Sequence, residues 1–251
     1  MTDLPVFDAH LHVVDPAFPL VPNDGYLPPA FTVDDYRTAV AGLDVVGGAV
    51  VSGSFQAFDT TYLVDALARL GTGFVGVTNL LPDAPDDEIA RLDAAGVRAV
   101  RVNLYRGGST GFADLDRLAR RVHDMAGWHT ELYVDAADLP ALAPTLLALP
   151  RVSIDHLGMT DDSTGTLLGL VEKGHVVKAT GLGRITIADP AALVAAILGA
   201  NPHGLVFGTD LPSTRARQPY THTDVARIAR WAGEHAADVL AGNALRLYGA
   251  P

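Results

Sequence analysis

Two histidines one residue apart give the first indication of chemistry in this sequence. Phe7–Val13 has the sequence FDAHLHV and belongs to an apolar run typical of a β-strand. Side chains alternate along a strand, so His10 and His12 share one face. Two imidazoles on one face can hold a metal ion or polarise a carbonyl group. The alternative is two ordinary histidines near a strand end, but their pairing favours a chemical role.

Two other segments place polar side chains directly after apolar strands. His156 follows the strand expected at Val152–Asp155, where Asp155 could orient a neighbouring imidazole or begin a loop. Asp210 follows the run Leu205–Phe207, and a carboxylate there could ligate a metal or accept a proton from water. It could also cap the next segment. We expect the histidines and the aspartate to meet at one end of a parallel sheet.

The strands that must position these residues recur along the whole chain, spaced mostly by about 22 to 32 residues, the length of a strand, a helix and two turns. They are expected at Val6–Val14, Gly48–Val51, Phe74–Val77, Val97–Asn103, His129–Val134, Val152–Asp155, Val176–Ala179 and Leu205–Phe207. Helical periodicity predicts helices at Thr61–Leu70, Asp86–Ala95, Asp114–Ala126, Leu139–Leu149, Asp189–Leu198, Thr223–Leu240 (with a break near Gly233) and Asn243–Tyr248.

Strand alternating with helix predicts a parallel sheet. An open, doubly wound sheet is the rival, but eight similar units in 251 residues favour a closed (β/α)8 TIM-like barrel. No linker divides the chain, so residues 1–251 are expected to form a single domain. The stretch Gly71–Gly76 matches G-x-G-x-x-G, but it follows a helix and enters a strand. A dinucleotide site needs the opposite order, which argues against a dehydrogenase.

Composition excludes several classes of protein. Hydrophobic residues make up 49% and charged residues 19%, which argues against disorder. The net charge of −11 argues against binding to nucleic acid or to an anionic membrane. Cysteine is absent, which excludes disulfides, thiolate ligands and cysteine nucleophiles. No signal peptide and no run of membrane-spanning length is evident, so a cytoplasmic protein is expected.

The chain resembles the amidohydrolase superfamily, within amidohydrolase-related family 2, and is similar there to 2-pyrone-4,6-dicarboxylate lactonase-like and sugar-lactonase-like members. The resemblance runs from Phe7 to Tyr248. Its motifs are FDAHLHV on the first strand, GVRAVRVN on the fourth, ELYVDAADLP on the fifth, IDHLG on the sixth, FGTDLP on the eighth and the closing GNALRLYG.

The resemblance implies catalytic roles for four residues. Asp210 matches the aspartate that activates the attacking water. His10, His12 and His156 match histidines that polarise the scissile carbonyl in the pyrone lactonase and that ligate metal in metal-dependent relatives. A mononuclear zinc or manganese site formed by His10, His12 and Asp210 is one alternative, and a site without a cofactor is the other.

Two departures from the family pattern argue against a binuclear metal centre. Metal-dependent relatives commonly have a histidine at the end of strand five, whereas the segment Glu131–Asp135 has none. Binuclear members also have a bridging lysine or glutamate on strand four, whereas Arg101–Asn103 ends that strand here.

The resemblance also implies residues that bind the substrate. Tyr133 and Arg184 match a tyrosine and a carboxylate-binding arginine of the pyrone lactonase. Arg101 on strand four and the nearby Arg106 offer the geometry that matches carboxylates, and Ser54 could bind a substrate oxygen. The family pairs arginines in this loop, whereas Gly107-Gly108 follows Arg106 here, which weakens a strict match to a dicarboxylate. Each of the five residues could instead have an ordinary surface or capping role.

Three hypotheses follow. The first is a hydrolase that opens the lactone ring of a small carboxylate-bearing substrate, with water activated by Asp210. The second is a metal-dependent amidohydrolase or non-oxidative decarboxylase that uses the same histidines and aspartate. The third is a barrel that binds a small carboxylate without catalysis.

Overall fold

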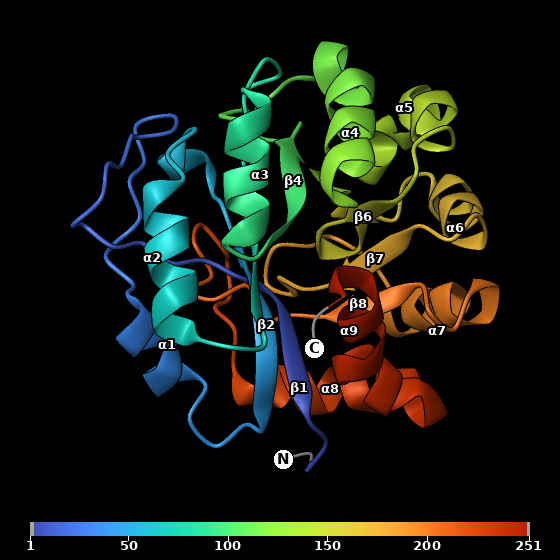
Figure 1. The fold of residues 1–251 in the computed structure, drawn as a ribbon. Coiled ribbons are helices and arrows are strands. Elements are labelled where there is room, and N and C mark those ends of the chain that lie inside the picture. The colour runs from blue at the N-terminus through green and yellow to red at the C-terminus, as the bar shows by residue number, and fades with distance from the viewer. Residues whose placement is uncertain (1–2, 250–251) are drawn as a thin grey trace.

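Eight parallel strands form one sheet that curves into a barrel, and the helices lie around its outside (Figure 1). The structure is a computed structural model that describes residues 3–249. The strands pair in chain order, which confirms the predicted (β/α)8 barrel. They are β1 Val6–Leu11, β2 Val45–Val51, β3 Phe74–Thr78, β4 Val97–Asn103, β5 His129–Tyr133, β6 Val152–Ile154, β7 Val176–Ala179 and β8 Leu205–Phe207.

The barrel is closed between β1 and the segment that follows β8. Leu11 and Leu211 form a parallel bridge. The Asp210 amide donates to the His10 carbonyl oxygen at 2.7 Å, and the His12 amide donates to the Leu211 carbonyl oxygen at 2.8 Å. We call this junction the seam. It lies at the carboxyl end of β1, where the predicted site residues are.

The Asp8 side chain reinforces the seam. Its carboxylate accepts hydrogen bonds from the amide and the hydroxyl of Thr209, both at 2.7 Å, and one from the Tyr36 hydroxyl at 3.2 Å. Burial raises the pKa of Asp8 to about 6 in spite of these hydrogen bonds. A carboxylate of β1 is therefore tied directly to the residue before Asp210.

The helices follow the predicted pattern with two additions, α1 and α6. They are α1 Val33–Ala39, α2 Thr61–Leu70, α3 Asp86–Ala94, α4 Phe112–Ala126, α5 Leu139–Leu146, α6 Thr164–Glu172, α7 Pro190–Ala200, α8 His222–Ala232 and α9 Asn243–Tyr248. The predicted break near Gly233 is confirmed: α8 ends there, and a 3-10 turn and a π turn at Asp238–Gly242 lead into α9.

The first strand is shorter than predicted, because the backbone beyond it has other partners. The expected strand ran to Val14, whereas β1 ends at Leu11. Past that point the His12 amide bonds to Leu211, and Val14 pairs antiparallel with Phe31. The chain therefore leaves the strand after Leu11, and His12 lies at the rim of the barrel.

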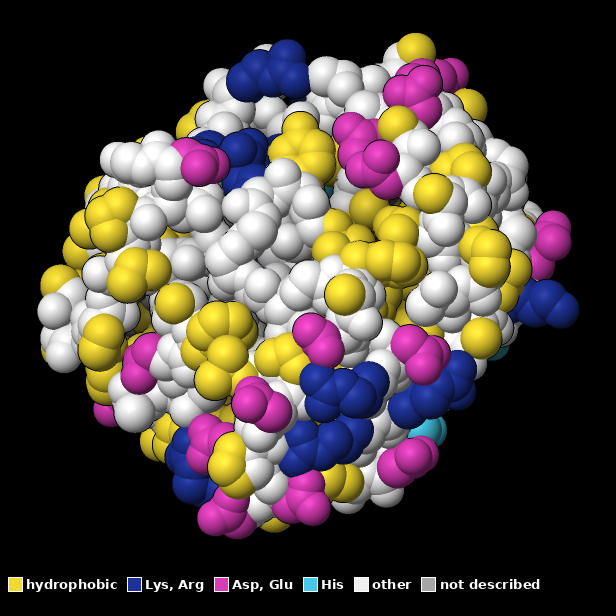
Figure 2. Space-filling model, turned by 90° about the horizontal axis from the view of Figure 1, so that it is seen from above, with side chains coloured by type: hydrophobic (Ala, Val, Ile, Leu, Met, Phe, Trp, Pro, Cys, Tyr) yellow, Lys and Arg dark blue, Asp and Glu magenta, His cyan; other side chains and the backbone are white. Residues whose placement is uncertain are grey.

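Charged side chains of both signs lie close together on parts of the surface. Figure 2 shows one face, on which Lys and Arg side chains lie among Asp and Glu side chains along the lower edge. On α4, for example, Arg117 forms an ion pair with Asp114 at 2.7 Å and Arg120 forms one with Asp116 at 3.0 Å. Among the described residues, no helix is long and apolar enough to cross a bilayer.

Candidate active site

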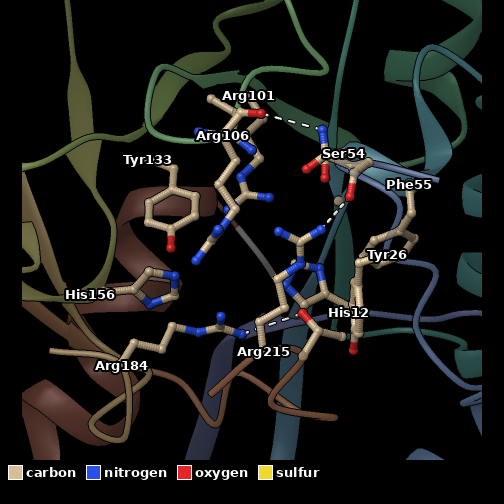
Figure 3. A pocket seen from close by; sticks show the side chains of 14 residues that line it. His12, Tyr26, Ser54, Phe55, Arg101, Arg106, Tyr133, His156, Arg184 and Arg215 are labelled. Atoms are coloured by element: carbon tan, nitrogen blue, oxygen red, sulfur yellow. Dashed lines mark hydrogen bonds between the residues drawn. The ribbon is translucent and has the colours of Figure 1, made fainter. Parts of the chain in front are cut away.

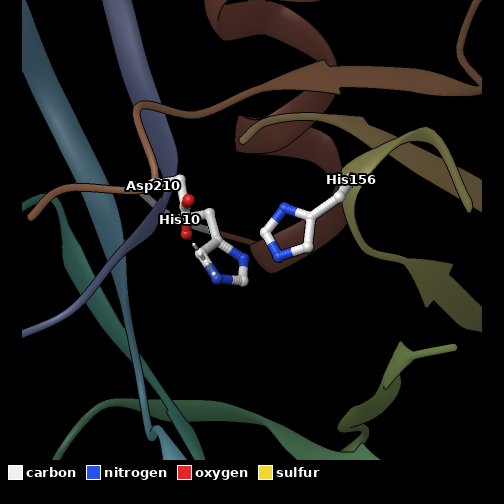
Figure 4. A group of neighbouring side chains, drawn as sticks. All are labelled: His10, His156 and Asp210. Carbon is white, nitrogen blue, oxygen red and sulfur yellow. Dashed lines mark ion pairs between the residues drawn. The ribbon is translucent and has the colours of Figure 1, made fainter. Parts of the chain in front are cut away.

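The four residues predicted to be catalytic meet at one end of the barrel. Asp210 Oδ1 lies 3.9 Å from His10 Nε2 and 3.7 Å from His12 Nε2. The His156 ring lies 5.0 Å from the His10 ring, centroid to centroid. Figure 4 shows His10, His156 and Asp210 facing a common space. All four side chains are buried, so their interactions are only weakly screened by solvent.

Unusual backbone conformations turn two of these side chains inward. Asp210 has φ of +60° and His156 has φ of +51°. This left-handed region is uncommon for residues other than glycine, although Asp, Asn and His enter it more readily than most. Such strain persists only where the surroundings hold it, and for Asp210 the bond from its amide to His10 does so.

The ring nitrogens of His10 and His12 that point away from Asp210 have different partners. His12 Nδ1 lies 2.7 Å from the carbonyl oxygen of Val51, which can only accept, so Nδ1 donates. His10 Nδ1 lies 3.4 Å from a carboxylate oxygen of Glu131, 3.4 Å from one of Asp155 and 3.5 Å from the Lys178 ammonium, which can only donate. Burial lowers the pKa of His10 well below its usual value, so the ring is neutral. His10 Nε2 is available as a ligand atom when Nδ1 carries the ring proton toward a carboxylate.

Three possible ligand atoms converge on one point. His10 Nε2 and His12 Nε2 lie 3.9 Å and 3.7 Å from Asp210 Oδ1. His10 Nε2 and Asp210 Oδ1 are buried and have no hydrogen-bond partner among residues 3–249. Two imidazole nitrogens and one carboxylate oxygen are a ligand set typical of catalytic zinc, so the residues fit one divalent metal ion.

The structure also groups a slightly different set of possible ligands. The sequence predicted His10, His12 and Asp210, whereas ligand atoms of His10, His156 and Asp210 all lie within 4.8 Å of one another. His156 therefore lies close enough to contribute a ligand or to contact a molecule bound at this point.

Asp210 forms an ion pair with Arg184 in the structure. Arg184 Nε donates to Asp210 Oδ2 at 2.5 Å. Burial alone would raise the pKa of Asp210, but the charge of Arg184 holds it below the usual range. Asp210 is therefore ionised throughout the neutral range. The sequence suggested a substrate carboxylate as the partner of Arg184, whereas here its partner is a carboxylate of the protein.

A cavity lies over this group (Figure 3). The five residues predicted to bind substrate all line it, as do His12 and His156. His10 and Asp210 are not in the wall. The complete lining is His12, Asn23, Tyr26, Gly53, Ser54, Phe55, Arg101, Asn103, Arg106, Tyr133, His156, Arg184, Thr214 and Arg215.

Sequence reasoning missed a charged layer inside the barrel, beneath His10. Lys178 on β7 is fully buried, and its ammonium group contacts Glu131 on β5 and donates to the Ala9 carbonyl oxygen at 2.8 Å. Arg101 on β4 donates to Asp155 at 2.9 Å. Lys178, Glu131, Arg101 and Asp155 form what we call the inner charged layer. The signal in the sequence was a lysine that interrupts the apolar run Val176–Ala179.

Sequence reasoning also missed cavity residues in loops. Asn23 and Tyr26 come from the loop after β1, and Thr214 and Arg215 come from the loop after β8. Neither loop has a periodicity that would reveal which side chains turn inward.

A parallel eight-stranded barrel with two histidines at the end of its first strand, one after its sixth and an aspartate after its eighth defines a class of barrel hydrolases. The model of the Amidohydro_2 family, described as amidohydrolase, matches residues 7–250. The chain therefore belongs to this amidohydrolase family and is a hydrolase.

Named relatives act on lactones. The chain is 32% identical over 163 residues to a 2-pyrone-4,6-dicarboxylate hydrolase of Comamonas testosteroni, over 63% of this chain and only 53% of that relative. It is 27% identical over 273 residues to a 4-sulfomuconolactone hydrolase of Rhizobium radiobacter, over 97% of this chain and 89% of that relative. It is also 26% identical over 250 residues to a D-galactarolactone isomerase of Agrobacterium fabrum, over 92% of this chain and 85% of that relative.

Solved structures share the fold. An apo crystal structure from Agrobacterium tumefaciens superposes with a TM-score of 0.87 at 22% identity, covering 100% of this chain and 97% of that one. A probable 2-pyrone-4,6-dicarboxylic acid hydrolase from Acinetobacter baumannii, with citric acid bound, superposes with a TM-score of 0.81 at 22% identity, covering 99% and 100%. At these identities the similarity establishes the barrel.

Proposed function

We propose that this enzyme hydrolyses the lactone ring of a small, carboxylate-bearing substrate. The observation that carries the proposal is the ionised Asp210, within 4 Å of His10 and His12 beneath a cavity lined by arginines. The lactone substrates in the names of two relatives, both hydrolases, support the same reaction class.

Asp210 is the general base in this proposal. Its Oδ1 has no hydrogen-bond partner among the described residues and so is free to accept one from water. As the water oxygen attacks the acyl carbon, Asp210 takes one of its protons. The bond from the acyl carbon to the ring oxygen then breaks, and the proton passes from Asp210 to the ring oxygen. The product is an open-chain hydroxy acid.

In this proposal His156 stabilises the negative charge that develops on the carbonyl oxygen. Burial lowers the pKa of His156 to about 4, so the ring is neutral at pH 7. Its Nδ1 lies 2.8 Å from the Thr180 hydroxyl. When that hydroxyl donates to Nδ1, Nε2 carries the ring proton and can donate to the substrate oxygen. A divalent ion bound by His10, His12 and Asp210 would add Lewis-acid polarisation and lower the pKa of a bound water.

Arg184 couples substrate binding to the strength of the base. A substrate carboxylate that reaches Arg184 competes with Asp210 for the guanidinium group. The charge that holds down the pKa of Asp210 is then shared, so Asp210 becomes a stronger base once the substrate is bound. An uncharged lactone would leave the ion pair intact.

The test is ring opening by the purified enzyme with matched lactones that differ only in a carboxylate substituent. We expect kcat/KM for the carboxylated lactone to exceed that for the uncharged lactone by about 100-fold or more, as for a charge-assisted pair. Amides with the same acyl group serve as the comparison. Absence of lactone turnover across such a panel would exclude the proposal.

The second candidate is a metal-dependent reaction at the same site, either amide hydrolysis or decarboxylation. It is favoured by the convergence of His10 Nε2, His12 Nε2 and Asp210 Oδ1, of which the first and the last have no hydrogen-bond partner among the described residues. We expect calorimetry to show one zinc or manganese ion binding per chain, and the double replacement His10→Asn, His12→Asn to abolish that binding. Activity that disappears on chelation and returns with metal would favour this candidate. Full lactonase activity in metal-free protein would favour the first.

A further inference from the structure

The two histidines that line the cavity have partners of opposite hydrogen-bonding character. His12 and His156 enter the cavity from different sides (Figure 3). His12 Nδ1 lies 2.7 Å from the carbonyl oxygen of Val51, which can only accept a hydrogen bond. In the neutral ring only one nitrogen carries a hydrogen, and here that nitrogen is Nδ1. The Nε2 atom of His12 is therefore an acceptor.

The partner of His156 is a hydroxyl group that is itself constrained. The Thr180 hydroxyl oxygen accepts from the His156 amide at 3.3 Å and lies 2.8 Å from His156 Nδ1. Thr180 is fully buried, and among residues 3–249 its hydroxyl has no other hydrogen-bond acceptor. A buried hydroxyl hydrogen without an acceptor is costly, so it is directed at Nδ1. The Nε2 atom of His156 therefore carries the ring hydrogen and is a donor.

The acceptor of His12 faces a second acceptor. Its Nε2 lies 3.7 Å from Asp210 Oδ1, which has no hydrogen-bond partner among the described residues. The other carboxylate oxygen of Asp210 is already bonded to Arg184. A separation of 3.7 Å is too long for a direct hydrogen bond. It is close to the span of roughly 4 Å between two acceptors that share one water molecule. Water at this point can donate one hydrogen to each.

We propose that these contacts divide the site into two sides. His12 and Asp210 together hold the attacking water, and His156, oriented by Thr180, binds the carbonyl oxygen on the other side. This inference rests on the proposed lactone hydrolysis in its metal-independent form. It assigns His12 a role opposite to the carbonyl polarisation that the resemblance implied. An acceptor cannot stabilise the negative charge that develops on the carbonyl oxygen, but it can orient the water toward the acyl carbon.

Nitrogen NMR of the histidine rings tests the directions of these hydrogen bonds without requiring turnover. At pH 8 we expect a hydrogen on Nδ1 of His12 and on Nε2 of His156. Spectra of the His12→Asn and His156→Asn variants assign the two rings. Thr180→Val should remove the hydrogen bond to His156 Nδ1, and Thr180→Ser should restore it. A hydrogen on Nε2 of His12, or on Nδ1 of His156, would overturn the proposal.

The same two variants separate water binding from carbonyl binding, because asparagine reaches only as far as Nδ1 and so removes Nε2 alone. The probe is 6-oxopiperidine-2-carboxylate, an unreactive lactam whose carbonyl stretch is followed by infrared spectroscopy. We expect His156→Asn to raise the stretching frequency of the bound probe and His12→Asn to leave it unchanged. On lactones, His12→Asn should lower kcat by about 10- to 100-fold and keep KM within about threefold of the wild type. The control is His203→Asn, an exposed histidine before β8, which should behave as the wild type.

The outcomes distinguish the two possible roles of His12. A rise in frequency in His12→Asn equal to that in His156→Asn would mean that His12 polarises the carbonyl, and would overturn the proposal. Lactone opening that requires a divalent ion would also overturn it, because the ion would take the lone pair of His12 Nε2. The expected ring hydrogens in an enzyme that opens no lactone would instead support the two hydrogen-bonding sides and reject the proposed reaction.

Discussion

The replacement Asp210→Asn should lower kcat for lactone opening by about 10³-fold or more, since a positioned general base contributes factors of up to about 10⁴. The amide cannot accept the proton from water. Asparagine tolerates the left-handed backbone at this position almost as well as aspartate does, so the bond to the His10 carbonyl should remain. Steady-state kinetics, with circular dichroism to confirm the fold, provides the measurement.

The control for Asp210 is a carboxylate at the same end of the barrel but outside the cavity. Asp135 follows β5, where it accepts hydrogen bonds from the Ala137 amide and the Thr160 hydroxyl. Asp135→Asn should therefore keep kcat within about threefold of the wild type. An Asp210→Asn enzyme with unchanged turnover would mean that another group activates the water.

The replacement Lys178→Met should lower the free energy of unfolding by about 3 to 5 kcal/mol, the usual effect of removing one partner from a buried ion pair. Glu131 would remain in the barrel interior without its ammonium partner. Even with Lys178 present, burial raises the pKa of Glu131 to about 7. Urea denaturation at neutral pH measures the change. Lys173, the only other lysine, is exposed, so Lys173→Met should change stability by less than about 0.5 kcal/mol.

The sign of the pH dependence provides a second test of the buried pair. Without Lys178, the folded-state pKa of Glu131 should rise still further above its unfolded-state value. A carboxyl group of this kind contributes stability at low pH that is lost as the pH rises through its folded-state pKa. The Lys178→Met variant should therefore be more destabilised at pH 8 than at pH 5, and adding Glu131→Gln should remove that difference. Equal destabilisation at both pH values would contradict a charged pair.

The sequence allowed the barrel and its rim to be predicted, because both follow from local periodicity. His10 and His12 are two residues apart and so share one face of a strand, and the strands of a parallel barrel all end on the same side. The proximity of the two histidines to Asp210 therefore followed from topology. The interior was harder to predict. Nothing local indicates that Lys178 faces Glu131 across the barrel, since that contact joins β7 to β5. The pairing of Arg184 with Asp210 and the inward turn of Arg215 depend on loop paths that have no periodic signal. Helix α6 was missed because its apolar residues do not mark out one face.

The seam links unfolding of this enzyme to loss of its active site. The backbone bonds that join the first strand to the end of the last belong to the residues that carry the chemistry. The barrel therefore cannot open along this junction and still keep an intact catalytic apparatus. A molecule bound between His10 and Asp210 contacts both sides of this junction. Its binding therefore stabilises the folded state, and the free energy of unfolding rises with the occupancy of the site.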